Sequence, residues 1–181
     1  RQRLGGGRVA PVLVTGFRRS FNQEPVRRLR PGPDRAVLSV SEQPDATFNG
    51  LVITGVSEET LAALDAREAG YERIRIDWRQ VDCYHGGRSS PMDASGPQGE
   101  LFLYRGRLER RNDCLHPNPD YLRLCLAGAG HWGASFRETF LASTMLHGAT
   151  LKTYLDDRTS QLHSRSGHGP ATHGEPSDSR G

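Results

Sequence analysis

The sequence predicts a mixed α+β protein built as one domain, on three observations. Residues 10–22, 36–43 and 46–56 contain short runs of β-branched and aromatic residues, which are typical of strands. Residues 58–69 have the composition of a helix, and residues 117–146 carry apolar side chains at helical spacing. A chain of 181 residues can bury one core of ordinary size but not two.

The first strand, 10–22, should end in the loop 23–35, which contains prolines and a glycine. The next two segments alternate apolar with small or polar residues. Pro44 and Asp45 stand between them, so we expect two strands joined by a turn at this point.

The helix expected at 58–69 has clear signals at both ends. Ser57 is a suitable N-cap, Glu58 and Glu59 complement the helix dipole in the first turn, and Gly70 ends the helix. The strand expected at 71–83 follows without a linker. Its apolar side consists of Ile74, Ile76 and Trp78.

The second half of the chain should contribute one strand and two helices. Residues 84–99 have the composition of a loop, residues 100–106 of a short strand, and residues 117–146 of two helices separated near 128–133. Residues 158–181 have little to bury, so we expect a disordered tail and a domain that spans 11–157.

The composition argues against a membrane or nucleic-acid function. The longest apolar runs fall far short of the roughly 18 to 20 residues that a membrane span needs, and no secretory signal is recognisable. A group of arginines lacks interleaved aromatics and any nucleic-acid motif, so a solvated face is expected. These arginines are Arg18, Arg19, Arg27, Arg28 and Arg30.

Three cysteines without CxxC spacing argue against a disulfide framework and indicate a cytoplasmic protein. Cys83 and His85, like Cys114 and His116, stand two residues apart, which places each pair on one face of a strand. Together the four could form a tetrahedral zinc site, but the spacing is atypical of zinc modules. We therefore expect no metal.

A carboxylate at the end of the expected helix stands out. Leu61, Leu64 and Glu68 follow the spacing i, i+3 and i+7, so they share one face. Because an unpartnered buried carboxylate costs free energy, it is normally paired or has a raised pKa. Glu68 is therefore either a rim residue that reaches solvent or an arginine such as Arg73, or a partly buried acid–base group.

The segment 48–76, FNGLVITGVSEETLAALDAREAGYERIRI, resembles the central signature of the γ-glutamylcyclotransferase-like family. That signature is a strand with an early glycine, a helix that ends in L-D-x-x-E, and a tyrosine that opens the next strand. The segments VLVTGFRRSFN and PNPDYLRLCLAGAGHWG are similar to the family's second strand and late helix. The resemblance covers most of residues 9–157. Its central residues are Leu64, Asp65, Glu68 and Tyr71.

The resemblance implies a small mixed β-barrel with peripheral helices. It implies that Glu68 is the general acid/base, that Tyr121 and Tyr71 bind the substrate, and that no cofactor is needed. The implied reaction is intramolecular: the free α-amino group of a small γ-glutamyl compound attacks the γ-carbonyl, giving 5-oxoproline and a free amine. We expect Asp65 to be structural, as a partner of backbone or of an arginine.

One part of the family's pattern does not occur in this sequence. The family begins with a strand and a Y-G-S-L or Y-G-S-N loop that binds the γ-glutamyl group, whereas residues 1–10 look like a remnant of the segment after it. We therefore expect either a truncated enzyme or a catalytically silent member that acts as a small-molecule binding module. The sequence predicts neither the leaving amine nor the oligomeric state.

Overall fold

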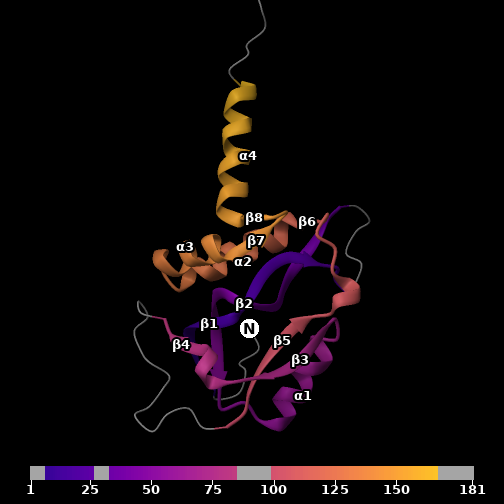
Figure 1. Ribbon diagram of the computed structural model, residues 1–181, viewed down its shortest axis with the longest axis vertical. Coiled ribbons are helices and arrows are strands. Elements are labelled where there is room, and N and C mark those ends of the chain that lie inside the picture. Colours follow the sequence, from indigo (N-terminus) through magenta and orange to yellow (C-terminus); the bar gives the residue numbers. More distant parts are fainter. Residues whose placement is uncertain (1–6, 27–32, 85–98, 167–181) are drawn as a thin grey trace, which may run out of the picture.

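The computed structural model describes residues 7–26, 33–84 and 99–166. Its centre is a long antiparallel pair, β1 (Arg8–Gln23) and β2 (Asp34–Thr54), which runs through the middle of the molecule (Figure 1). β1 confirms the strand expected at 10–22. Because both strands are far longer than an average strand, they carry most of the packing surface for the rest of the chain.

The two strands expected at 36–43 and 46–56 form one strand, β2, and the turn expected at Pro44 and Asp45 is wrong. The register of pairing with β1 shifts there. Thr15 pairs with Thr47 and Phe17 pairs with Glu42, so two steps along β1 correspond to five along β2. The extra β2 residues form a bulge opposite Gly16. Proline, which cannot donate a ladder hydrogen bond, is tolerated at such a bulge.

Short strands extend this pair into a six-stranded mixed sheet, in the order β6-β2-β1-β7-β8 with β4 also against β1. β7 (Thr144–Leu146) runs parallel to β1, and β6 (His116–Pro117) runs parallel to β2. β4 (Val81–Cys83) and β8 (Ala149–Thr150) complete it. The sheet is a curled half-barrel; the closed barrel expected from the resemblance is not seen in the described residues.

A second, two-stranded sheet consists of β3 (Tyr71–Ile76) and β5 (Leu101–Gly106). β5 confirms the strand expected at 100–106. The single strand expected at 71–83 is interrupted by a 3-10 turn at Trp78–Gln80. The cause is local, because the Asp77 and Gln80 side chains form a reciprocal capping box around that turn.

The helix α1 (Glu58–Arg67) joins β2 to β3. The expected N-cap is present: Ser57 Oγ accepts a hydrogen bond from the Thr60 N–H at 3.2 Å. The helix ends earlier than expected, with Glu68 as the C-cap residue. None of its residues is buried, so the face that Leu61 and Leu64 share is only half covered.

The expected pair of late helices is confirmed as α2 (Pro119–His131) and α3 (Ala134–Ser143). A further helix, α4 (Leu151–Ser166), stands out from the body of the molecule and continues past the domain end expected at 157 (Figure 1). Residues 167–181 of the expected tail lie outside the described part. Among the described helices, none is both long and apolar enough to span a membrane.

The β1–β2 pair separates two apolar cores. The first lies against the β3–β5 sheet and includes Val12, Val14, Phe48 and Ile76, with Ile74 and Trp78 packed on it as expected. The second lies under the helices at the other end of the pair. It consists of Phe21, Ala36, Leu115, Ala129, Phe136, Phe140, Leu146 and Leu151.

Candidate functional site

Glu68 lies where α1 ends and the turn into β3 begins. Its backbone N–H donates to the Leu64 carbonyl at 2.8 Å, which fixes the residue at the helix end. Its side chain is 26% exposed, and one carboxylate oxygen accepts from Nε and Nη2 of Arg67, both at 2.9 Å. The structure therefore places Glu68 at the rim, with an arginine partner that is its chain neighbour and not Arg73.

Tyr71 opens β3, as expected, and turns its hydroxyl inward. The hydroxyl donates a hydrogen bond of 2.6 Å to the Leu38 carbonyl of β2. Burial raises the pKa of Tyr71 to about 12, and the negative charges of Glu68 and of a Cys125 thiolate add to the effect. The Tyr71 N–H also donates to the Glu68 carbonyl at 2.8 Å, which joins the two residues through the backbone.

Tyr121 lies in the first turn of α2 and packs edge-on against Phe21, with 6.2 Å between ring centroids. Its hydroxyl hydrogen-bonds the Cys125 thiol one turn later. Burial raises the pKa of Tyr121 strongly, and interactions with Cys125 and Tyr71 raise it further. Tyr121 thus packs on the second apolar core, and its role in substrate binding stays a prediction.

Glu68, Tyr71 and Tyr121 come from a helix end, a strand and another helix. The Tyr71 N–H donates to the Glu68 carbonyl at 2.8 Å, and its hydroxyl donates to the Leu38 carbonyl at 2.6 Å. Leu38 pairs with Phe21 next to a second irregularity in the β1–β2 ladder. Both tyrosines therefore contact the β1–β2 ladder next to the point where its regular pairing changes.

Asp65 is a structural residue, as expected. Its carboxylate accepts from the Tyr104 hydroxyl at 2.7 Å and pairs with Arg73 at 3.1 Å. These contacts tie α1 to β3 and β5. Burial, followed by the bond to Asp65, raises the pKa of Tyr104 to about 12. Asp65 thus positions the end of α1, and with it Glu68.

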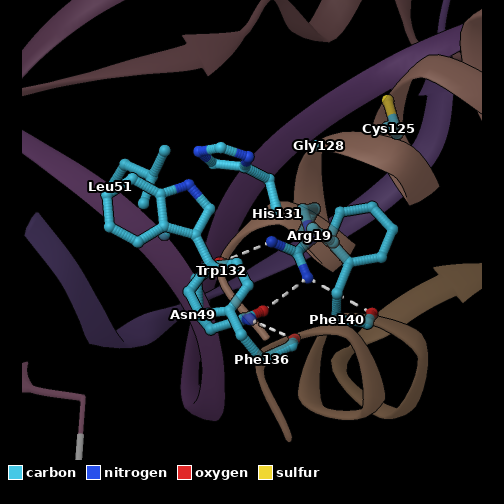
Figure 2. A pocket seen from close by; sticks show the side chains of 11 residues that line it. Arg19, Asn49, Leu51, Cys125, Gly128, His131, Trp132, Phe136 and Phe140 are labelled. Atoms are coloured by element: carbon cyan, nitrogen blue, oxygen red, sulfur yellow. Dashed lines mark hydrogen bonds between the residues drawn. The ribbon is translucent and has the colours of Figure 1, made fainter. Parts of the chain in front are cut away.

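A separate pocket of about 340 Å³ lies between β2 and the helices α2 and α3, and Cys125 is one of its lining residues (Figure 2). Glu68, Tyr71 and Tyr121 are not among its lining residues. Arg19, Asn49, Phe136 and Phe140 form its buried base, while Leu51, Gly128 and His131 are exposed near its mouth.

Arg19 is buried, with 7% of its surface exposed. The expectation that it lies on a solvated face is therefore wrong. Strand alternation is the physical reason, since Phe17, Arg19 and Phe21 follow at intervals of two on β1 and all three are buried. That spacing was readable in the sequence. Arg27, Arg28 and Arg30 lie outside the described residues.

The zinc arrangement is not supported by the described residues, in which no group of three or more His, Cys, Asp or Glu could hold a metal ion. His85 lies outside the described part. Cys114 is exposed, and the His116 ring packs edge-on against His147 at 4.6 Å between centroids. The three cysteines form no disulfide.

Comparison with known proteins places the fold. No protein-family model matches the chain. No curated protein matches it either. A solved structure of a γ-glutamyl cyclotransferase is similar, with a TM-score of 0.52 and 14% sequence identity, over 88% of this chain and 89% of that chain. Two solution structures of Arabidopsis thaliana proteins give TM-scores of 0.37 and 0.38, too low to carry an argument.

The protein is therefore an α+β protein with a curled mixed sheet and helices on its outer side. This is the fold of the γ-glutamyl cyclotransferase to which it is similar. At 14% identity the likeness defines the fold and leaves the activity open, since one fold serves many chemistries.

Proposed function

We propose that this protein is a γ-glutamylcyclotransferase-type enzyme, which converts a small γ-glutamyl amine, amino acid or peptide to 5-oxoproline and a free amine. The fold of a γ-glutamyl cyclotransferase supports the proposal. The observation that carries it is the position of Glu68 at the C-cap of α1, where its carbonyl accepts a hydrogen bond of 2.8 Å from the Tyr71 N–H. Both residues belong to the sequence element that resembles the family.

In the proposed reaction Glu68 accepts a proton from the α-amino group of the substrate. The amine nitrogen attacks the γ-carbonyl carbon, a new C–N bond closes the five-membered ring, and the bond to the leaving nitrogen breaks. Glu68 returns the proton to that nitrogen, so protons and electrons balance without a co-reactant. Nucleophile and electrophile belong to one molecule, so the protein mainly holds the folded-over conformer.

Glu68 has a partner that it must exchange for the substrate. Arg67 is 66% exposed, and an exposed ion pair contributes only about 0.2 to 1 kcal/mol. A substrate ammonium can therefore replace the guanidinium at small cost. Glu68 is a better candidate than Asp65, whose carboxylate is engaged by both Tyr104 and Arg73.

Tyr71 and Tyr121 are proposed to line the side of the site opposite Glu68. The bonds of Tyr71 to Leu38 and of Tyr121 to Cys125 hold the two hydroxyls in place. Because each hydroxyl has a single proton and these bonds engage it, both hydroxyls would meet a substrate as hydrogen-bond acceptors. The three thiols suit the reducing cytoplasm, which is the proposed location.

The test is release of 5-oxoproline from a panel of γ-glutamyl amino acids, γ-glutamyl amines and glutathione. The Glu68→Gln variant keeps the size of the side chain but removes its basicity, and we expect release to fall by roughly a hundredfold or more. Glu59→Gln, an exposed carboxylate in the first turn of the same helix, is the matched control and should keep full activity.

Equal activity in the wild type and Glu68→Gln would overturn the role of Glu68. Absence of release by the wild type on every member of the panel would overturn the enzyme. The second candidate function, a silent module that binds a γ-glutamyl compound, then gains support. Glu68 forms an ion pair with Arg67 and is not among the residues that line the pocket, and both observations favour that alternative. Calorimetric binding of a γ-glutamyl compound without turnover would establish it.

A further inference from the structure

The base of the pocket holds a buried positive charge. The Arg19 guanidinium donates to Thr144 Oγ1 at 2.8 Å and to Asn49 Oδ1 at 3.0 Å, and also reaches the Asn49 and Phe140 carbonyls and Ser143 Oγ. The Phe140 ring covers one face of the guanidinium, at 4.1 Å from its carbon to the ring centroid. Every one of these partners is formally neutral.

Arg19 has no carboxylate partner among the described residues. Neutral oxygens stabilise a guanidinium by their dipoles, but they leave its net charge uncompensated inside a low-dielectric region. Burial accordingly lowers the pKa of Arg19 to about 9. A buried cation that faces a cavity favours an anion within that cavity.

The rest of the cavity is apolar and largely aromatic. Phe136 and Phe140 lie beside Arg19, and Figure 2 shows Trp132, His131 and Leu51 gathered at the opposite wall. A volume of about 340 Å³ is at the lower end of the range for small-molecule sites and accommodates a single ring with a short side chain. Walls of this kind favour an apolar body, which an inorganic anion lacks.

The geometry points to a second binding site in this pocket, for a small aromatic carboxylate whose anionic group approaches Arg19 and whose ring packs against Trp132. The site is separate from the proposed reaction, because Glu68 and Tyr71 do not line it. Cys125, which lines the pocket and hydrogen-bonds Tyr121, is the side chain that adjoins both regions.

Three probes separate charge from apolar contact. Phenylacetate has the ring and the charge, phenylethanol has the ring alone, and acetate has the charge alone. Calorimetric titration of the full chain should give measurable binding of phenylacetate, with phenylethanol and acetate each at least about tenfold weaker, as expected for loss of a charged or an apolar contact. Equal binding of phenylacetate and either of the others, or no binding of phenylacetate, would overturn the proposal.

Gly128 offers a way to block the pocket without touching Arg19. It lies on α2 at the mouth, and a Cβ built on it meets nothing within 4 Å. Gly128→Leu should fill the mouth and abolish phenylacetate binding, whereas Gly128→Ala, the matched control, should fold at least as stably and still bind. Binding that survives Gly128→Leu would place the ligand elsewhere and would also overturn the proposal.

Discussion

Arg19 and Glu68 are the two charged side chains on which the functional interpretation depends, and the protein holds them in opposite ways. Arg19 is buried and engages two strands and the end of a helix through a set of neutral oxygens. Glu68 lies at a helix end, 26% exposed, and engages one exposed neighbour, Arg67. A fixed charge can select a ligand, whereas a charge with a replaceable partner can exchange protons.

The difference in burial predicts a difference in stability, which is the largest effect expected. Arg19→Met should lower the free energy of unfolding by about 3 kcal/mol or prevent folding, because it leaves Asn49 and Thr144 without their partner inside the protein. Arg67→Met, at an exposed arginine, should change it by less than about 0.5 kcal/mol. Urea denaturation of both variants measures the two changes. Similar losses of unfolding free energy in both would contradict the proposed difference between the two charged sites.

A smaller effect is expected at the cap that holds the region of Glu68. Ser57→Ala removes the acceptor for the Thr60 N–H and should cost about 1 kcal/mol. Because α1 buries no residue, the loss should be local and should appear as faster hydrogen exchange of the α1 amides.

Asn118→Ala is the matched control for Ser57→Ala. It removes the cap of α2, which packs on the helical core, and should lower global stability instead. Faster exchange confined to α1 in both variants would contradict this account.

A third effect depends on pH. Tyr71 has a pKa of about 12 in the folded state, raised mainly by burial and secondarily by Glu68, against about 10 when unfolded. The folded state therefore binds more protons between these values, and stability falls as pH rises above about 10. Tyr71→Phe should make this decline shallower, by up to about 1 kcal/mol per pH unit.

Glu68→Gln should also make the alkaline decline shallower than in the wild type, but less than Tyr71→Phe does, because burial of Tyr71 remains. Urea unfolding at a series of pH values between 9 and 11 measures all three slopes. A slope for Glu68→Gln identical to that of the wild type would mean that the carboxylate does not face Tyr71.

Local sequence signals predicted most elements of the fold. The cap at Ser57, the proline at the start of α2 and the β-branched run in β1 each act through neighbouring residues, and each gave the right element. The misses depend on long-range pairing. Nothing local to Pro44 reveals that β1 continues to pair on both sides of it, so a bulge was interpreted as a turn.

The candidate site was predicted through resemblance more than through periodicity. The structure joins Tyr71 to Glu68 through a backbone hydrogen bond, and the site roles of these residues and of Tyr121 stay predictions. The spacing of Leu61 and Leu64 overstated the burial of α1. Arg19 was missed because a run of arginines suggests a solvated face. Its place between Phe17 and Phe21 at strand spacing was the signal that would have found it.

The most direct test of the proposed chemistry follows the oxygen atoms of the product. The wild type is incubated with its best γ-glutamyl substrate in water enriched in the heavy oxygen isotope, and the masses of the products are measured by mass spectrometry. Attack by the α-amine predicts 5-oxoproline that contains no heavy oxygen, because water takes no part in forming the ring. Glutamate that carries heavy oxygen would reveal hydrolysis of the γ-amide and would contradict the intramolecular mechanism.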